Sequence, residues 1–361
     1  MESNLILPGL LKKGDTIAIL APSSGLGAIF PHRIENAAAA LKEIGFNVKR
    51  YPSCSSILPD GSSMSAAERA NEINQAFADK KVDAIIAAIG GLQANAILDL
   101  LDYKLIRANP KPFIGYSDIT LIHHAIHCKS GVMTFYGPCA MTQFGEYPKP
   151  LGYTIEYFKK ALMADAPFEV NASGSWTDEL LNWAEKKDLE RPRKMKKNVG
   201  HVWVREGSST APMVGGCLYS ILQLRKTDFE IDYENKILFI ETPEGQDFTK
   251  GEPLAYVDSQ MQDLKNSHVF NKIKGLVVGR GFGYSEEEIK TFEGIVRKHT
   301  KDFNFPVLFN ANIGHADPII TLPFGAKVTL DSEKNLFQIS TRAGRAAASA
   351  PARSTQQRRI K

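Results

Sequence analysis

Residues 111–120 contain one serine in a sequence pattern that can expose its hydroxyl as a nucleophile. Their pattern predicts a short buried strand, a tight turn that carries Ser117, and the start of a helix. In such a turn the serine hydroxyl projects into solvent, and the first free N–H groups of the helix point at the space where an oxyanion forms. The segment therefore predicts acyl transfer with Ser117 as nucleophile. The alternative is an ordinary helix start that Asp118 or Thr120 caps.

Two later residues supply the groups that a serine nucleophile needs. Glu241 ends the apolar run 236–241, and His315 follows another apolar run in a glycine-flanked loop. An imidazole can take the proton of the serine, and a buried carboxylate fixes the ring tautomer and stabilises the imidazolium. Taken singly, Glu241 is also readable as a strand-end acid and His315 as a plain loop residue. Together with Ser117 they predict a Ser-Glu-His triad.

A glycine pair, Gly90 and Gly91, follows an apolar run that predicts a buried strand over residues 82–89. Glycines at the carboxyl end of a parallel strand bring bare backbone N–H groups to the edge where α/β proteins bind ligands. The pair could complete an oxyanion hole, and a plain strand-to-helix turn is the alternative. The chain has neither G-x-G-x-x-G nor G-K-[ST], so we expect no nucleotide cofactor.

The histidines that follow the serine turn have the spacing of a zinc helix but lack its other parts. His123 and His127 are four residues apart, while His124 stands where H-E-x-x-H has its catalytic glutamate. No third ligand is evident nearby. We therefore expect histidines that pack a helix, with no metal and no other cofactor. A metal-dependent hydrolase that uses His123 and His127 is the least favoured alternative.

The charge pattern argues against nucleic acid or membrane as a partner. The net charge is +4, but residues 340–361 hold six of the Lys and Arg residues and no acid, so the rest of the chain carries about −2. No apolar run is long enough for a membrane helix, and the first residues lack the pattern of a secretion signal. Four scattered cysteines without C-x-x-C spacing fit a reducing compartment. We expect a cytoplasmic protein that acts on a small molecule.

Strand and helix patterns alternate in the first part of the chain, which predicts a parallel α/β sheet. We predict an N-terminal α/β domain over residues 1–145, a connecting segment with a mobile loop over 146–200, a C-terminal domain over 201–339, and a disordered basic tail over 340–361. A short helix is expected to begin at residues 215–218. Predicted helices in the first domain span residues 30–45, 65–78 and 96–101, and predicted strands span 14–21, 46–51, 82–89 and 131–137.

Two tryptophans lie in the polar part of the connecting segment. Exposed Trp176 and Trp183 cost solvation unless they cover something, so they are candidates for a lid over an aromatic or apolar group of the substrate. The alternative is that both pack locally onto the body of the protein.

Three segments together resemble the signatures of the LD-carboxypeptidase family of serine peptidases, and the likeness extends over about residues 8–339. The segments are Ile114-Gly115-Tyr116-Ser117-Asp118, Ile240-Glu241, and Gly314-His315-Ala316-Asp317-Pro318. The resemblance implies two α/β domains with the active site in the cleft between them, a triad of Ser117, Glu241 and His315, and a homodimer. It also implies that the N–H groups of Asp118 and Gly91 bind the oxyanion, and that Gly90 lies against the substrate.

The substrate expected from this resemblance is a small molecule with a peptide-type or carboxyamide bond. Members that cleave muropeptides usually have Arg-Gly-Gly where this chain has Ile89-Gly90-Gly91. The tryptophan-bearing loop and Tyr136-Gly137-Pro138 look more like the microcin C immunity branch, which implies an aminoacyl-nucleotide or related amide. On that analogy Trp176 or Trp183 stacks on a flat ring. A muropeptide carboxypeptidase and a non-catalytic ligand-binding α/β protein are the alternatives.

Overall fold

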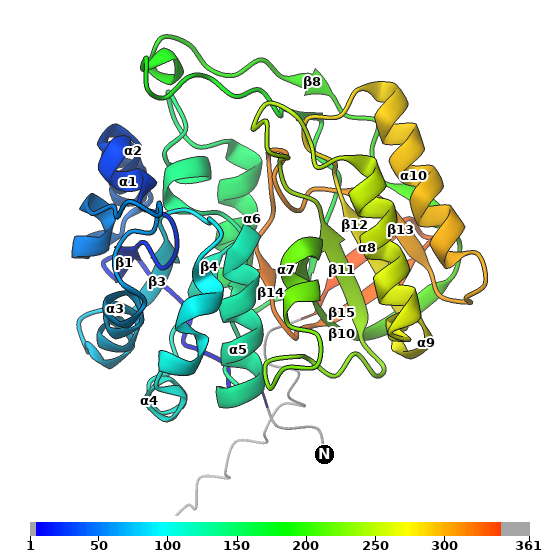
Figure 1. Cartoon of the computed structure of the whole chain (residues 1–361), viewed down its shortest axis with the longest axis horizontal. Coiled ribbons are helices and arrows are strands. Elements are labelled where there is room, and N and C mark those ends of the chain that lie inside the picture. Colours follow the sequence, from blue (N-terminus) through cyan, green and yellow to red (C-terminus); the bar gives the residue numbers. More distant parts are fainter. Residues whose placement is uncertain (1–4, 341–361) are drawn as a thin grey trace, which may run out of the picture.

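Two β-sheets with their covering helices organise residues 5–340, the part of the chain that a computed structural model describes (Figure 1). One sheet and its helices belong mainly to the first half of the chain, and the other to the second half. The predicted fold class, two α/β domains, is confirmed. The expected basic tail lies outside the described residues except for Ser340.

The first sheet has six strands in the order β14-β5-β4-β3-β1-β2. The five strands of this sheet that come from the first half of the chain are parallel to one another, as predicted. The central strands among them are buried because helices cover both faces of the sheet. The sixth strand, β14, comes from the far end of the chain and runs antiparallel to β5. The strands are β1 (Thr16–Leu20), β2 (Asn47–Arg50), β3 (Ala84–Ala87), β4 (Phe113–Gly115), β5 (Phe135–Tyr136) and β14 (Leu322–Pro323).

The helices around this sheet largely follow the predicted pattern. The predicted helix over residues 30–45 is α2, which ends at Gly45 with φ of 114°, and α3 begins with a capping box between Ser65 and Glu68. Residues 94–100 form a 3-10 turn instead of an α-helix. The helices are α1 (Leu26–Ile29), α2 (Pro31–Ile44), α3 (Ala66–Ala78), α4 (Tyr103–Ala108) and α5 (Thr120–Ser130), with shorter turns η1 (Pro52–Ser55), η2 (Ala94–Leu100), η3 (Ser117–Ile119) and η4 (Ala140–Phe144).

The second sheet has eight strands in the order β6-β16-β15-β10-β11-β12-β13-β9. Strands β10 to β13 are parallel to their neighbours in this central group, and the flanking strands are antiparallel. The strands are β6 (Phe168–Glu169), β9 (Val202–Arg205), β10 (Ser208–Cys217), β11 (Ile237–Glu241), β12 (Gly275–Gly279), β13 (Val307–Ala311), β15 (Lys327–Asp331) and β16 (Leu336–Ile339). The helices are α7 (Leu218–Gln223), α8 (Leu254–Asn266), α9 (Val269–Lys272) and α10 (Glu286–Thr300).

Strand β10 corrects one prediction. Residues 215–217, expected to open a helix, end this strand, and α7 begins only at Leu218. The two glycines at the strand end allow a close approach, since a Cβ on Gly216 would lie 2.4 Å from the Cγ2 atom of Thr120 at the start of α5. The second sheet therefore touches the first domain directly beside the serine turn.

The connecting segment contains more structure than its polar composition predicts. Helix α6 (Gly152–Leu162) packs on the first domain with Tyr157, Phe158 and Leu162 fully buried, and the ring of Phe158 lies 5.2 Å from that of Phe144. Strand β6 joins the edge of the second sheet. Only the later part is irregular, apart from the paired strands β7 (Ser175–Trp176) and β8 (Lys196–Lys197) and the turn η5 (Lys187–Leu189). We call residues 173–198 the strap.

The strap runs along the top of Figure 1, from above α2 on the first domain to β8 beside the second. Its position follows from contacts at both ends, which are described below. No helix within residues 5–340 is long and apolar enough to cross a membrane.

Candidate active site

Three strand ends bring Ser117, Glu241 and His315 together. Ser117 follows β4, Glu241 is the last residue of β11, and His315 lies in the loop after β13. The Nε2 atom of His315 is 3.0 Å from Ser117 Oγ, and its Nδ1 atom is 2.7 Å from Glu241 Oε2. The carboxyl ends of strands from both sheets thus meet, and the three side chains form one hydrogen-bonded line across the two domains.

The turn that carries Ser117 has a strained backbone. Ser117 has φ of 68°, a left-handed conformation that is costly for a residue with a Cβ, and its side chain is partly exposed. Gly90 lies against it, because a Cβ there would be 2.8 Å from Ser117 Cβ. The Thr120 hydroxyl donates to the Ser117 carbonyl (2.6 Å) and accepts from Cys217 N–H (3.0 Å). Packing from both domains therefore holds the turn.

The expected helix cap is absent. Helix α5 starts after a 3-10 turn, and no side chain caps it. Thr120 donates to the Ser117 carbonyl and accepts from an N–H of the other domain instead of one in α5, and the Asp118 carboxylate turns away toward the glycine pair. The reading of this segment as an ordinary capped helix start is therefore wrong.

Glu241 is fully buried and its two oxygens have separate partners. Oε2 contacts His315, and Oε1 accepts a hydrogen bond of 2.6 Å from the Tyr136 hydroxyl. A buried carboxylate needs such partners to stay charged. Gly314, at φ of 102°, makes room for it, since a Cβ there would lie 2.6 Å from Oε2. The strand-end acid is thus held in hydrogen-bond contact with the imidazole of His315.

Tyr136 connects Glu241 to Ser117 from the other side. Its hydroxyl donates to Glu241 and accepts from the Ser117 N–H at 3.2 Å. The residue comes from β5 of the first domain, whereas Glu241 belongs to the second. The sequence pointed to Tyr136 only as part of the segment Tyr136-Gly137-Pro138 and predicted no role for it. Nothing in the local sequence reveals a contact with a residue 105 positions away.

A second acid faces the same imidazole. Glu244 Oε2 lies 3.4 Å from His315 Nε2, the nitrogen that also faces Ser117. Burial lowers the pKa of His315, but the charges of Glu241 and Glu244 outweigh it and raise the pKa to about 9. The two carboxylates therefore favour the protonated form of this imidazole. Sequence reasoning missed Glu244, which looks like any other acid in a polar loop.

Asp118 ties the glycine pair to the serine turn. Its Oδ2 atom accepts hydrogen bonds from the Ser23 hydroxyl (2.6 Å) and from Ala94 N–H (3.2 Å). Burial raises the pKa of Asp118 to about 6, against the opposing effect of these hydrogen bonds. Gly91 lies against the same serine, because a Cβ there would be 2.5 Å from Ser23 Oγ. Both segments expected to form the oxyanion hole are thus side by side, while the donors themselves stay a prediction.

The two tryptophans of the strap lie in different places, and both have protein neighbours. Trp183 packs edge-on against Phe30 (5.6 Å between ring centroids) with the Arg33 guanidinium 4.4 Å from its ring. The Trp176 ring has Lys196 at 4.5 Å and Arg280 at 4.8 Å. The strap thus places one tryptophan on each domain.

The three histidines of α5 are packing residues, of which His123 and His124 are fully buried and His127 is partly exposed. The Nε2 atoms of His123 and His124 each lie 2.9 Å from a backbone carbonyl, that of Gly115 and that of Gly215, and the His127 ring contacts Phe324. Burial lowers their pKa values to about 4, 3 and 4. Within residues 5–340 no group of three or more His, Cys, Asp or Glu side chains is arranged to hold a metal ion.

Comparison with family models matches both halves of the chain. The LD-carboxypeptidase N-terminal domain matches residues 17–137, and the LD-carboxypeptidase C-terminal domain matches residues 210–330. These ranges contain all three residues of the hydrogen-bonded line.

Known proteins resemble the chain over nearly its whole length. The putative carboxypeptidase YocD of Bacillus subtilis is 31% identical, covering 89% of this chain and 95% of its own. The microcin C7 self-immunity protein MccF of Escherichia coli is 29% identical, and the match covers 94% of this chain and 97% of MccF. A crystal structure of an MccF-like protein from Bacillus anthracis has a TM-score of 0.85 at 33% identity, covering 93% and 99%. MccF in complex with aspartyl sulfamoyl adenosine has a TM-score of 0.86 at 29% identity, covering 94% and 99%.

Proposed function

This chain belongs to the LD-carboxypeptidase family of serine peptidases, and we propose that it is a metal-independent hydrolase of a peptide-type or carboxyamide bond in a small substrate. The observation that carries the proposal is the line from Glu241 through His315 to Ser117, with contacts of 2.7 and 3.0 Å. This line supplies an acid, an imidazole and a hydroxyl in the order that acyl transfer needs. We assign Ser117 as nucleophile, His315 as base and then acid, and Glu241 as the group that orients His315.

The mechanism proceeds through an acyl-enzyme. Ser117 Oγ attacks the substrate carbonyl while its proton passes to His315 Nε2, and the tetrahedral oxyanion is held by the N–H groups of Asp118 and Gly91. His315 then gives the proton to the leaving amine as the C–N bond breaks. Water attacks the ester, His315 takes its proton, and Ser117 recovers its own as the acid product leaves. Glu241 stabilises the imidazolium in each half of the reaction.

For the substrate, we propose an aminoacyl-nucleotide or a related amide. MccF, a relative over the whole length, has been solved with aspartyl sulfamoyl adenosine. The strap carries two indole rings, one on each domain. Trp176 precedes Thr177, whose backbone pairs with Asp317 two residues beyond His315 (2.7 and 2.9 Å), so we assign Trp176 as the ring contact nearest the triad. Trp183 and Gly90 complete the proposed substrate contacts.

The tryptophan assignment is testable with a double variant. Replacing Trp176 and Trp183 with Ala is expected to raise KM far more than it lowers the melting temperature, because both rings are only half buried. A large fall in melting temperature with unchanged kinetics would show that they only pack.

Assembly and location are also proposals. We expect a homodimer, on the family resemblance, and a cytoplasmic location, which is consistent with four unpaired cysteines among the described residues.

A two-substrate assay tests the function. An aspartyl-adenylate amide analogue and an L,D-tetrapeptide are incubated with the wild type and with Ser117→Ala, each with and without EDTA. The proposal predicts EDTA-resistant cleavage of the analogue that disappears in the variant. Preference for the tetrapeptide would assign a muropeptide substrate to the same mechanism. Turnover that survives Ser117→Ala would refute the triad, EDTA-sensitive turnover would favour a metal-dependent reaction, and binding without turnover would favour a non-catalytic role.

A further inference from the structure

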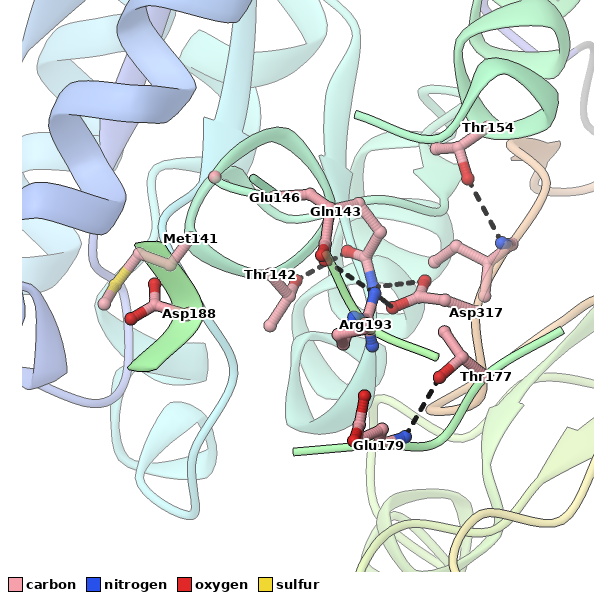
Figure 2. Close-up of polar contacts among 12 residues, drawn as sticks. Met141, Thr142, Gln143, Glu146, Thr154, Thr177, Glu179, Asp188, Arg193 and Asp317 are labelled. Carbon is pink, nitrogen blue, oxygen red and sulfur yellow. Dashed lines mark hydrogen bonds and ion pairs between the residues drawn. The ribbon is translucent and has the colours of Figure 1, made fainter. Parts of the chain in front are cut away.

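One arginine of the strap is buried between carboxylates of the two domains. The Nη2 atom of Arg193 lies 2.7 Å from Glu146 Oε2 and 2.7 Å from Asp317 Oδ2, and the three side chains are 13%, 7% and 5% exposed (Figure 2). Burying three charges has a large desolvation cost, so a group of this kind is weak evidence for stability alone. Its position beside the predicted triad suggests another reason for it.

Asp317 connects this ion group to both sides of the proposed triad. It follows His315 by two residues, and its Oδ1 atom accepts a hydrogen bond of 3.1 Å from the Gln143 amide, as Figure 2 shows. The same amide is 3.4 Å from the Tyr116 hydroxyl. Tyr116 precedes Ser117, and its ring packs edge-on against the His315 ring with centroids 4.9 Å apart. The network therefore reaches the loop of the base and the turn of the nucleophile.

The strap itself is anchored to both domains. Asp188, at its far bend, accepts from Arg33 of α2 at 2.9 Å and lies 3.1 Å from His32 Nε2. At the other end, Thr177 pairs with Asp317 through two backbone hydrogen bonds. Arg193 adds a charged contact at this second anchor. A displacement of the strap would therefore act on Asp317 and, through it, on the loop of His315.

We propose that Arg193 is a positioning residue for the hydrolysis: it neutralises Asp317 and ties it to Glu146, and so holds His315 in hydrogen-bond contact with Ser117 while the strap is in place. This inference rests on the proposed serine mechanism. Arg193 touches none of the three residues of the proposed triad, so it acts only through Asp317.

The charges around the imidazole give this role a signature that packing alone would not produce. The carboxylates that act on the His315 ring are Glu241, Glu244, Glu252 and Asp317. Arg193 is the cation bound to one of them. Without it, Asp317 presents an uncompensated negative charge, which favours the imidazolium. Loss of Arg193 should therefore shift the acidic limb of the activity profile to higher pH as well as slow the reaction.

The experiment compares Arg193→Gln, Arg193→Lys and a matched control, Arg191→Gln. Arg191 lies in the same strap and pairs with Glu179 at 2.7 Å instead of with Asp317. The readout is the rate at which a fluorophosphonate acylates Ser117 across pH 6–10, together with the melting temperature. This probe reports activation of the serine without knowledge of the substrate.

We expect Arg193→Gln to slow acylation at least about tenfold and to move the acidic limb upward, since small losses of alignment have large effects on rate. Arg193→Lys should restore the position of the limb, and Arg191→Gln should match the wild type. If Arg193→Gln is too unstable to assay, Glu146→Gln removes the other anchor and should slow acylation in the same way. Acylation by Arg193→Gln or Glu146→Gln at the wild-type rate, with the limb unmoved, would overturn the inference alone. Absence of acylation in the wild type would refute the serine mechanism and this inference with it.

Discussion

Glu244→Gln is expected to change the pH at which the enzyme becomes active. In the proposed mechanism His315 must be neutral to accept the proton of Ser117, and nearby carboxylates raise its pKa to about 9, above the ordinary value of 6.5. The rate should therefore increase with pH through an apparent pKa well above 6.5. The Glu244 carboxylate is 3.4 Å from the ring nitrogen and 34% exposed, so it contributes to this shift while solvent screens it.

The size of the effect follows from the distance. Two unit charges at this separation interact by about 1.2 kcal/mol in a water-like dielectric, which corresponds to about 0.9 pH unit. Glu244→Gln should therefore shift the acidic limb of the pH–rate profile to lower pH by about one unit, and the plateau rate at high pH should stay similar. The variant should consequently be more active than the wild type at pH 7, because a larger fraction of His315 is neutral.

The assay is the acylation rate or kcat/KM measured from pH 5.5 to 10 for the wild type, Glu244→Gln and Glu293→Gln. Glu293 is a suitable control because it lies on α10 and pairs with Arg297 at the surface. A wild-type limb near 6.5, or a limb that Glu244→Gln leaves in place, would refute the charge argument. A shift of the same size in Glu293→Gln would show that the effect comes from overall charge.

Three further outcomes are expected. Tyr136→Phe removes the hydroxyl shared by the acid and the nucleophile, so kcat/KM should fall at least about tenfold, with a stability loss of about 1–2 kcal/mol in urea unfolding; unchanged kinetics would contradict this. Gly90→Ala should reduce kcat/KM at least about 100-fold, because its Cβ would collide with Ser117, whereas Gly174→Ala, which meets nothing within 4 Å, should be neutral; equal activities would contradict the packing argument. The α5 histidines are neutral in the folded protein and protonate more readily when unfolded, so stability should be full above pH 6.5 and fall by roughly 3 kcal/mol for each histidine by pH 4. His127→Leu should give a shallower pH dependence of the unfolding free energy, and a wild-type curve that is flat between pH 6.5 and 4.5 would contradict the burial argument.

The parts of the site that local patterns specify were predictable. Ser117 stands between an apolar run and a helical pattern, and His315 stands between glycines after another apolar run. Such patterns reveal strand ends, and strand ends are where parallel sheets carry functional groups. Tyr136 and Glu244 were not predictable as site residues, because their roles depend on how the two domains face each other.

The fold shows the same division. Alternating apolar patterns predict the parallel strands of the first sheet, but β14 has only two residues and pairs with β5 from the first half of the chain. Helix α6 was missed because polar residues surround its buried stripe. In β10 the glycines weaken the strand pattern of the sequence. Gly216 is needed there because Thr120 of the other domain approaches its backbone closely. Long-range packing decides each of these features.

The most direct test of the account is the covalent trapping of the nucleophile. A fluorophosphonate is added to the wild type, Ser117→Ala and His315→Asn, and the adduct is counted by intact mass and located by peptide mapping. The account predicts one adduct on Ser117 in the wild type, none in Ser117→Ala, and formation slowed by about 100-fold or more in His315→Asn. An adduct on another residue, or one that forms equally fast in all three proteins, would contradict it.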